Sequence, residues 1–153
     1  MKFLLKTNNS FAPTLARLTL GIVMFPHGAQ KILGWFGGYG FNGTMNYFTQ
    51  QMHIPAVFAF LAIAAEFLGS LGLITGFLSR IAALGIAVNM IVAVQMVHGA
   101  NGFFMNWFGN QKGEGFEYHI LTIGLALIVM IFGAGKVSVD ATIAGAGARK
   151  PVK

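Results

Sequence analysis

Glu66 stands in the middle of a long apolar run of the sequence. An ionised carboxylate near the middle of a bilayer costs on the order of 3 kcal/mol, so a Glu at that depth must be paired, protonated or hydrated. If the run forms a membrane-spanning helix, Glu66 is therefore the leading candidate for proton transfer or ligand binding. The alternative is structural, with a hydrogen-bonded Glu66 that fixes its helix against a neighbour.

Two pairs of polar side chains at helical spacing lie near the ends of other apolar runs. His27 and Lys31 are four residues apart, and Gln95 and His98 are three residues apart, so each pair shares a helix face. At about 1.5 Å per residue, His27 and Gln95 reach roughly the height of Glu66. We expect the two faces to line one pocket with Glu66.

The two histidines, His27 and His98, allow three interpretations. They could be hydrogen-bonded interfacial side chains, donors to the head group of a quinone, or the two ligands of a b-type haem between parallel helices. We favour the first two over haem. Asn89 falls half a turn out of phase with His98 at about 100° per residue, so we expect it to contact a neighbouring helix instead.

The composition indicates the environment of these residues. Of the 153 residues, 56% are hydrophobic and only 9% are charged, which is typical of a membrane protein. The formal charge of +6 raises the question of nucleic acid, but the long apolar runs argue against that partner. Cysteine is absent, which excludes disulfides and iron–sulfur ligation by this chain. The scattered methionines form no cluster typical of a copper transporter, so we expect no metal site.

Four apolar stretches approach the roughly 20 residues that a helix needs to cross a bilayer. They are residues 13–33, 55–78, 80–98 and 118–134. The sequence therefore predicts an all-α integral membrane four-helix bundle over residues 1–140, followed by a flexible basic cytoplasmic tail over residues 141–153. Small residues recur as Ala65-x-x-x-Gly69, which we interpret as packing within the bundle, with a homodimer contact as the alternative.

Positive charge predicts the orientation in the membrane. Eight of the ten Lys and Arg residues fall at the ends that share one face, which places both termini in the cytoplasm. Arg17, about 6 Å above that face, is too low to meet Glu66, so we expect it to form an ion pair with Asp140. The two long loops, residues 34–54 and 99–117, then face outward, and their many aromatic residues favour an interfacial belt over a ligand platform.

The outer loops also carry an internal echo. His27-Gly28-Ala29 is followed by Trp35-Phe36-Gly37, and His98-Gly99-Ala100 is followed by Trp107-Phe108-Gly109. This pattern indicates two parallel hairpin repeats related by an axis along the membrane normal.

Glu117 and His119 open the fourth apolar stretch at the level of the expected pocket. Because they are two residues apart on a helix, they point to different faces. Only one of them can easily join the pocket.

A series of motifs runs in order through roughly residues 12–140. They are Leu15-Ala16-Arg17, His27-Gly28-x-x-Lys31, Gly34-Trp35-Phe36-Gly37-Gly38, Ala65-Glu66-Phe67-Leu68-Gly69, Thr75-Gly76-x-x-Ser79-Arg80, Asn101-Gly102-Phe103-Phe104, Gly115-Phe116-Glu117-Tyr118 and Gly135-Lys136-x-Ser138-x-Asp140. Together they resemble the DoxX family. The resemblance implies a small four-helix protein of the bacterial or archaeal inner (plasma) membrane. It also implies kinship with subunits of a terminal quinol oxidase and of a thiosulfate:quinone oxidoreductase, and with membrane partners of other redox proteins.

The residues and the resemblance together predict a membrane subunit of a quinone-linked oxidoreductase system, with a quinone pocket near the outer leaflet. We expect Glu66 and His27 to exchange protons with the quinone. His98 or Gln95 would bond its carbonyl oxygen, and Lys31 would stabilise a reduced head group.

Three further residues complete the expected site. Trp35 or Trp107 would stack on the ring, and Glu117 adds a carboxylate at the same level. The alternative function is a non-catalytic membrane anchor or assembly factor that presents its loops to redox partner proteins. A small transporter is a third interpretation.

Overall fold

The computed structural model describes residues 2–146, and every regular element among them is helical. The α-helices are α1 (Lys2–Leu5), α2 (Phe11–Leu33), α3 (Gly40–Asn46), α4 (Ala56–Thr75), α5 (Ser79–Ala93), α6 (Glu117–Phe132) and α7 (Val139–Ala146). The π-helical turns η2 (Tyr47–Gln51) and η3 (Val94–His98) continue α3 and α5, and the 3₁₀ turns η1 (Trp35–Gly37) and η4 (Gly99–Asn101) follow α2 and η3. The all-α fold class is confirmed for these residues.

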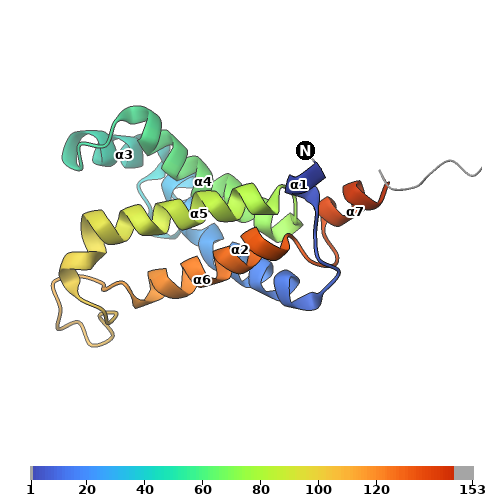
Figure 1. Ribbon diagram of the computed structural model, residues 1–153. Helices are drawn as coiled ribbons and strands as arrows, with labels where there is room; N and C mark the ends of the chain where they lie inside the picture. The colour runs from blue at the N-terminus through green and yellow to red at the C-terminus, as the bar shows by residue number, and fades with distance from the viewer. Residues whose placement is uncertain (1, 147–153) are drawn as a thin grey trace, which may run out of the picture.

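The four long helices form the bundle. Helix α2 packs against α4, α4 against α5, α5 against α6 and α6 against α2, so the contacts close into a ring. The core of the ring consists of buried apolar side chains, among them Leu20, Met24, Leu73, Ile86 and Val129. Figure 1 shows α1, α7 and the α4–α5 turn at one end of the bundle, and α3 and the loop after η4 at the other. We call these the terminal end and the loop end.

The observed helices lie close to the four predicted stretches. Helix α2 starts two residues before residue 13, and α5 with η3 covers residues 79–98. Helix α4 ends at Thr75, before the predicted residue 78, because Gly76 at φ +73° takes the left-handed conformation that ends a helix. The bundle contacts also use the predicted small residues, since a Cβ on Gly85 would lie 3.1 Å from Ala65 Cβ.

Two of the helices are long and apolar enough to cross a membrane, judged by length and composition. They are Ala56–Thr75 and the continuous helix Ser79–Asn101. Helix α6 is apolar but has only 16 residues, and α2 contains Arg17 and Lys31. Membrane crossing by α2 and α6 therefore stays a prediction.

Arg17 does not form the predicted ion pair with Asp140, although both lie within the described residues. Its buried guanidinium donates hydrogen bonds to backbone carbonyls that follow α6 or end α4. The acceptors are Ala134 (3.0 Å), Val137 (3.0 Å), Ile74 (2.8 Å) and Leu73. The physical reason is that the last carbonyls of a helix have no partner within it, and a cation satisfies them well.

The Asp140 carboxylate takes the complementary position at the start of α5. It accepts hydrogen bonds from the backbone N–H groups of Leu78 (2.8 Å) and Ser79 (3.0 Å). The first N–H groups of a helix lack internal acceptors, so an acidic side chain stabilises that end. Arg17 and Asp140 thus both hold the α4–α5 turn, through the backbone rather than through each other.

The segment expected to be a flexible tail begins as a helix. Helix α7 extends to Ala146, and Ser138 Oγ accepts a hydrogen bond of 3.1 Å from Ala141 N at its start. Residues 141–146 therefore correct the prediction, because Asp140 and Ser138 anchor the start of this helix. Residues 147–153 of the predicted tail lie outside the described residues.

Candidate functional site

A cavity of about 430 Å³ lies toward the loop end of the bundle. Small-molecule sites usually have volumes of about 300–1,000 Å³, so this cavity could hold an aromatic head group. Its wall is mostly apolar. The ionisable or amide side chains on the wall are His27, Lys31, Glu66, Asn89, His98, Glu114, Tyr118 and His119.

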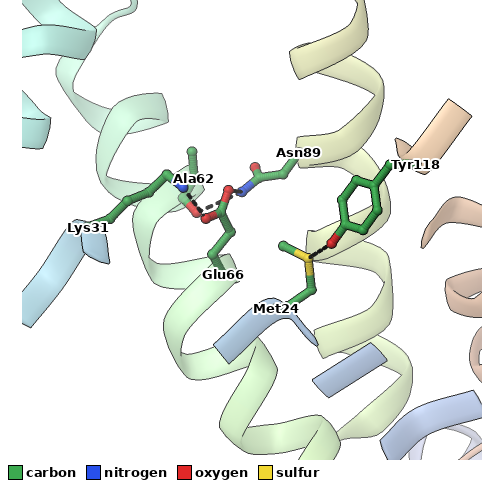
Figure 2. A network of polar contacts seen from close by, with 6 residues as sticks. All are labelled: Met24, Lys31, Ala62, Glu66, Asn89 and Tyr118. Carbon is green, nitrogen blue, oxygen red and sulfur yellow. Dashed lines mark hydrogen bonds and ion pairs between the residues drawn. The ribbon is translucent and has the colours of Figure 1, made fainter. Parts of the chain in front are cut away.

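Glu66 and Lys31 form an ion pair on this wall. Lys31 Nζ lies 2.5 Å from Glu66 Oε2, and the two side chains are 24% and 10% exposed. Asn89 Nδ2 lies 3.5 Å from Glu66 Oε1 and donates a shorter bond of 2.7 Å to the carbonyl of Ala62. Figure 2 shows Lys31 and Asn89 approaching Glu66 from two sides. The carboxylate is therefore held by two helices besides its own.

The close approach of α2 and α4 places this pair. Gly28 lies against the backbone of α4, where an added Cβ would be 2.6 Å from Phe67 Cα and 2.9 Å from Glu66 C. A glycine is needed where two helix backbones come this close. Lys31, one turn further along α2, then reaches across to Glu66.

A cluster of aromatic polar side chains forms another part of the wall. The His98 and His119 rings lie 4.2 Å apart between centroids, and the Tyr118 ring lies 6.3 Å from His27. Tyr118 Oη donates to Met24 Sδ at 3.4 Å, which is a weak acceptor (Figure 2). His27, Tyr118, His98 and His119 therefore extend the polar wall beyond the Glu66 network.

The hydrogen bonds of the two stacked histidines indicate what each can still bind. His98 Nδ1 lies 2.8 Å from the backbone carbonyl of Glu114, and a carbonyl can only accept, so this nitrogen carries a proton. In a neutral His98 ring, Nε2 is then an acceptor. His119 is 5% exposed, and its Nδ1 is buried without a hydrogen-bond partner among the described residues. A buried polar nitrogen of this kind is costly unless a ligand or water pairs with it.

Four residues expected in the pocket from the sequence do line the cavity. They are His27, Lys31, Glu66 and His98. This grouping agrees with the common height expected for His27 and Glu66. Their use by a ligand stays a prediction.

Four other expected site residues do not line the cavity. Glu117 Oε1 instead accepts hydrogen bonds from Met105 N (3.0 Å) and Trp107 Nε1 (3.1 Å), which orders the loop outside it. Trp107 is 77% exposed, and Trp35 is 53% exposed beside Phe36. The loop conformation that directs these side chains away depends on contacts that sequence spacing does not encode.

Gln95 and Asn89 exchange their expected places for one reason. Gln95 is exposed and absent from the cavity wall, whereas Asn89 lines it. Both expectations assumed α-helical rotation up to His98, but residues 94–98 form the π turn η3. Because a π turn bonds i to i+5, it changes which side chains share a face.

Tyr118 and His119 are also site residues that the sequence did not single out for the pocket. The expectation that only one of Glu117 and His119 joins the cavity is confirmed, and that one is His119. The available signal was their spacing of two residues on one helix, which does not say which of them faces inward.

Comparison with known families decides the relationship. The family model described as DoxX matches residues 12–99, which is more than half of the chain. This chain belongs to the DoxX family. No curated protein and no solved structure matches it.

The DoxX match extends over α2, α3, α4 and α5 and ends at Gly99. It therefore includes His27, Lys31, Glu66 and Asn89 of the cavity, whereas Tyr118 and His119 lie beyond it. DoxX proteins are membrane-associated, and the family is linked to oxidoreductase-related functions. The resemblance over residues 100–140 rests on the motifs of this chain alone.

Proposed function

We propose that this DoxX protein is the quinone- or quinol-binding membrane subunit of an oxidoreductase system. The observation that carries the proposal is the Glu66–Lys31–Asn89 network on the wall of a mostly apolar cavity. A charged network beside an apolar space suits an amphiphilic ligand whose polar groups need hydrogen bonds. Such a ligand also has to reach the site through the membrane.

The surface of the bundle supports a membrane environment for all four helices. Large apolar side chains are exposed along each of them, among them Leu15, Ile22, Phe58, Leu68, Leu84, Val88, Leu121 and Ile131. A soluble monomer rarely exposes apolar surface so extensively. In this proposal the bundle lies in the bacterial or archaeal plasma membrane, with both termini in the cytoplasm.

The polar groups of the cavity fit a ring that carries oxygen atoms on opposite sides. Tyr118 has only a thioether acceptor within the chain, and His119 Nδ1 has no partner among the described residues. Both groups can donate to a ligand oxygen. Glu66, Lys31 and Asn89 provide a second set of polar contacts on α4, α2 and α5.

The residues of the chain then have distinct roles. A bound quinone supplies the electron chemistry, exchanging electrons and protons with its quinol form. Glu66 and His27 take up or release protons at the ligand, while Lys31 and Asn89 hold the Glu66 carboxylate in place. His98 Nε2 accepts a proton or a hydrogen bond, because Nδ1 is engaged with Glu114.

The proposal does not extend to haem. A bis-histidine haem needs two imidazoles on opposite sides of the macrocycle. The ring of His98 packs against His119, and its Nδ1 is bonded to the Glu114 carbonyl. His98 would have to give up both contacts to face a haem.

The test is to purify the protein in mild detergent with native lipid and to quantify extracted quinone per protein. We expect bound quinone in the wild type and a marked loss in Glu66→Gln and His119→Phe. Asn89→Ala and Gln95→Ala form a matched pair, because both remove an amide from the same helix and only Asn89 lines the cavity. Equal quinone content in all variants, or none in the wild type, would reject the proposal.

A second candidate function, an anchor for redox partner proteins, is favoured by the loop after η4. Phe108 and Trp107 are 88% and 77% exposed, yet Glu117 holds the Trp107 indole and Glu114 Oε2 accepts from Asn106 N at 2.7 Å. An ordered loop that displays aromatic side chains suits a docking surface. Co-purification of partners from native membranes should then be lost in Trp107→Ala and kept in Glu66→Gln.

A further inference from the structure

The apolar part of the cavity is unusually rich in methionine. Of the eight methionines in the chain, Met1 lies outside the described residues, and five of the other seven line the cavity. They are Met24, Met52, Met90, Met96 and Met105. Methionine is unbranched and polarisable, so it adapts to apolar ligands of irregular shape. The sequence spacing of these residues gave no sign that they gather at one place.

The cavity reaches the surface on one side of the bundle. Four of its lining side chains are themselves exposed, namely Tyr47 of η2, Val92 of α5, and Met96 and Val97 of η3. Val92 lies 13 residues beyond Ser79, which is about 20 Å along the helix. In a bilayer with a hydrocarbon core of about 30 Å, an opening at this height faces lipid.

Both sides of this opening are built from irregular helix. One side is η2 and the turn to Ile54, and the other is the end of α5 with η3; η2 and η3 are the π turns found within residues 2–146. π turns occur frequently at functional sites. The polar network of Glu66, Lys31 and Asn89 lies on other parts of the same wall.

We propose that this opening, formed by residues 47–54 and 92–97, holds the apolar chain of an isoprenoid-tailed ligand that enters sideways from the bilayer. The inference rests on the proposed function and specifies its substrate class as a membrane-dissolved quinone rather than a water-soluble one. The ring lies inward at the polar wall. The methyl-branched chain passes between Met52 and Met96 toward lipid.

The first experiment uses photolabelling of the wild-type protein in nanodiscs. The probe is a benzoquinone with a farnesyl chain that carries a diazirine at its far end, and the labelled residues are mapped by mass spectrometry. We expect labels within residues 47–54 and 92–97. Labels confined to the loop after η4 would overturn the inference, because the chain would then leave through the loop end.

The second experiment compares two substitutions of the same type. Val97→Trp obstructs the opening, whereas Val88→Trp adds the same ring to the same continuous helix, where Val88 is 49% exposed and does not line the cavity. We expect Val97→Trp to weaken binding of the farnesyl quinone about tenfold, the effect of losing roughly two buried methylene contacts. Binding of the same ring with a methyl group in place of the chain should not change.

The outcomes separate this inference from the proposed function. If both ligands bind equally well to Val97→Trp and wild type, the opening is not the chain site, although the quinone site stands. If a ringless farnesyl probe labels residues 92–97 while neither quinone responds to Glu66→Gln, the chain site is a lipid site and both proposals fail. Should Val97→Trp not fold, Ile54→Trp obstructs the same opening from the opposite side and is read in the same way.

Discussion

The Lys31–Glu66 pair places two opposite charges where neither side chain is fully hydrated, since they are 24% and 10% exposed. Removing one partner leaves the other charge in a partly buried position. That loss is larger than the net contribution of the pair itself, because the remaining charge keeps its desolvation cost. Asn89 can compensate only in part, since its amide is already engaged with the Ala62 carbonyl.

This argument predicts a strong coupling between Lys31 and Glu66. Glu66→Gln and Lys31→Met should each lower the free energy of unfolding by about 1–3 kcal/mol, below the range for fully buried pairs because Lys31 is partly exposed. The double variant should lose less than the sum of the two. Thermal unfolding of the four proteins in the same detergent measures this coupling, and additive losses would show that the pair has no coupling.

The residue scale also shows how far sequence reasoning reached. His27, Lys31, Glu66 and His98 were predictable, because apolar runs and helical spacing place polar side chains at comparable heights. Gln95 was not predictable, since the π turn η3 rotates it away and no local pattern announces such a turn. Glu117 was misassigned for another reason: its hydrogen bonds reach residues 10 and 12 positions away in an irregular loop.

Between elements, the contact of α2 with α4 sets the geometry of the site. At Gly28 the added Cβ of alanine would meet backbone atoms of Phe67 at 2.6 and 2.7 Å, and backbone cannot move aside as a flexible side chain can. The two helices would have to separate. Lys31 would then lose its short contact with Glu66.

Gly28→Ala should therefore lower both stability and quinone binding. We expect a loss of about 1–3 kcal/mol in the free energy of unfolding, the usual cost of overpacking. Gly124→Ala is the matched control, because a Cβ there meets nothing within 4 Å and alanine favours a helix. Thermal unfolding and quinone content of both variants test this point; a Gly28→Ala protein that behaves like Gly124→Ala would contradict it.

The α4–α5 turn depends on the planar guanidinium of Arg17. An ammonium group cannot reproduce its planar array of donors, so Arg17→Lys should leave at least one buried carbonyl without a partner. We expect a loss of about 1–3 kcal/mol in the free energy of unfolding. The measurement is thermal unfolding in detergent, with quinone content as a control that the distant cavity is retained. An unchanged unfolding midpoint would mean that the Arg17 hydrogen bonds add no net stability.

For the whole molecule, the bundle was largely predictable and its two ends were not. Apolar runs are a local signal, so the helix ranges follow from the sequence to within a few residues. Helix α7 follows from contacts distant in sequence, because Asp140 N donates to the carbonyl of Gly76 and the Asp140 side chain binds the start of α5. The orientation in the membrane rests on charge alone, and the bundle itself gives it no direction.

The orientation can be measured directly, because the chain contains no cysteine and single cysteines can be labelled without background. Asn110→Cys lies in the exposed loop end and Asn9→Cys in the exposed segment before α2 at the terminal end. If basic residues keep the terminal end in the cytoplasm, a membrane-impermeant maleimide should label Asn110→Cys in intact spheroplasts and Asn9→Cys only after permeabilisation. The reverse pattern would invert the orientation and place the site near the cytoplasmic leaflet. Labelling of both positions in intact spheroplasts would contradict a bundle whose two ends lie on opposite sides of the membrane.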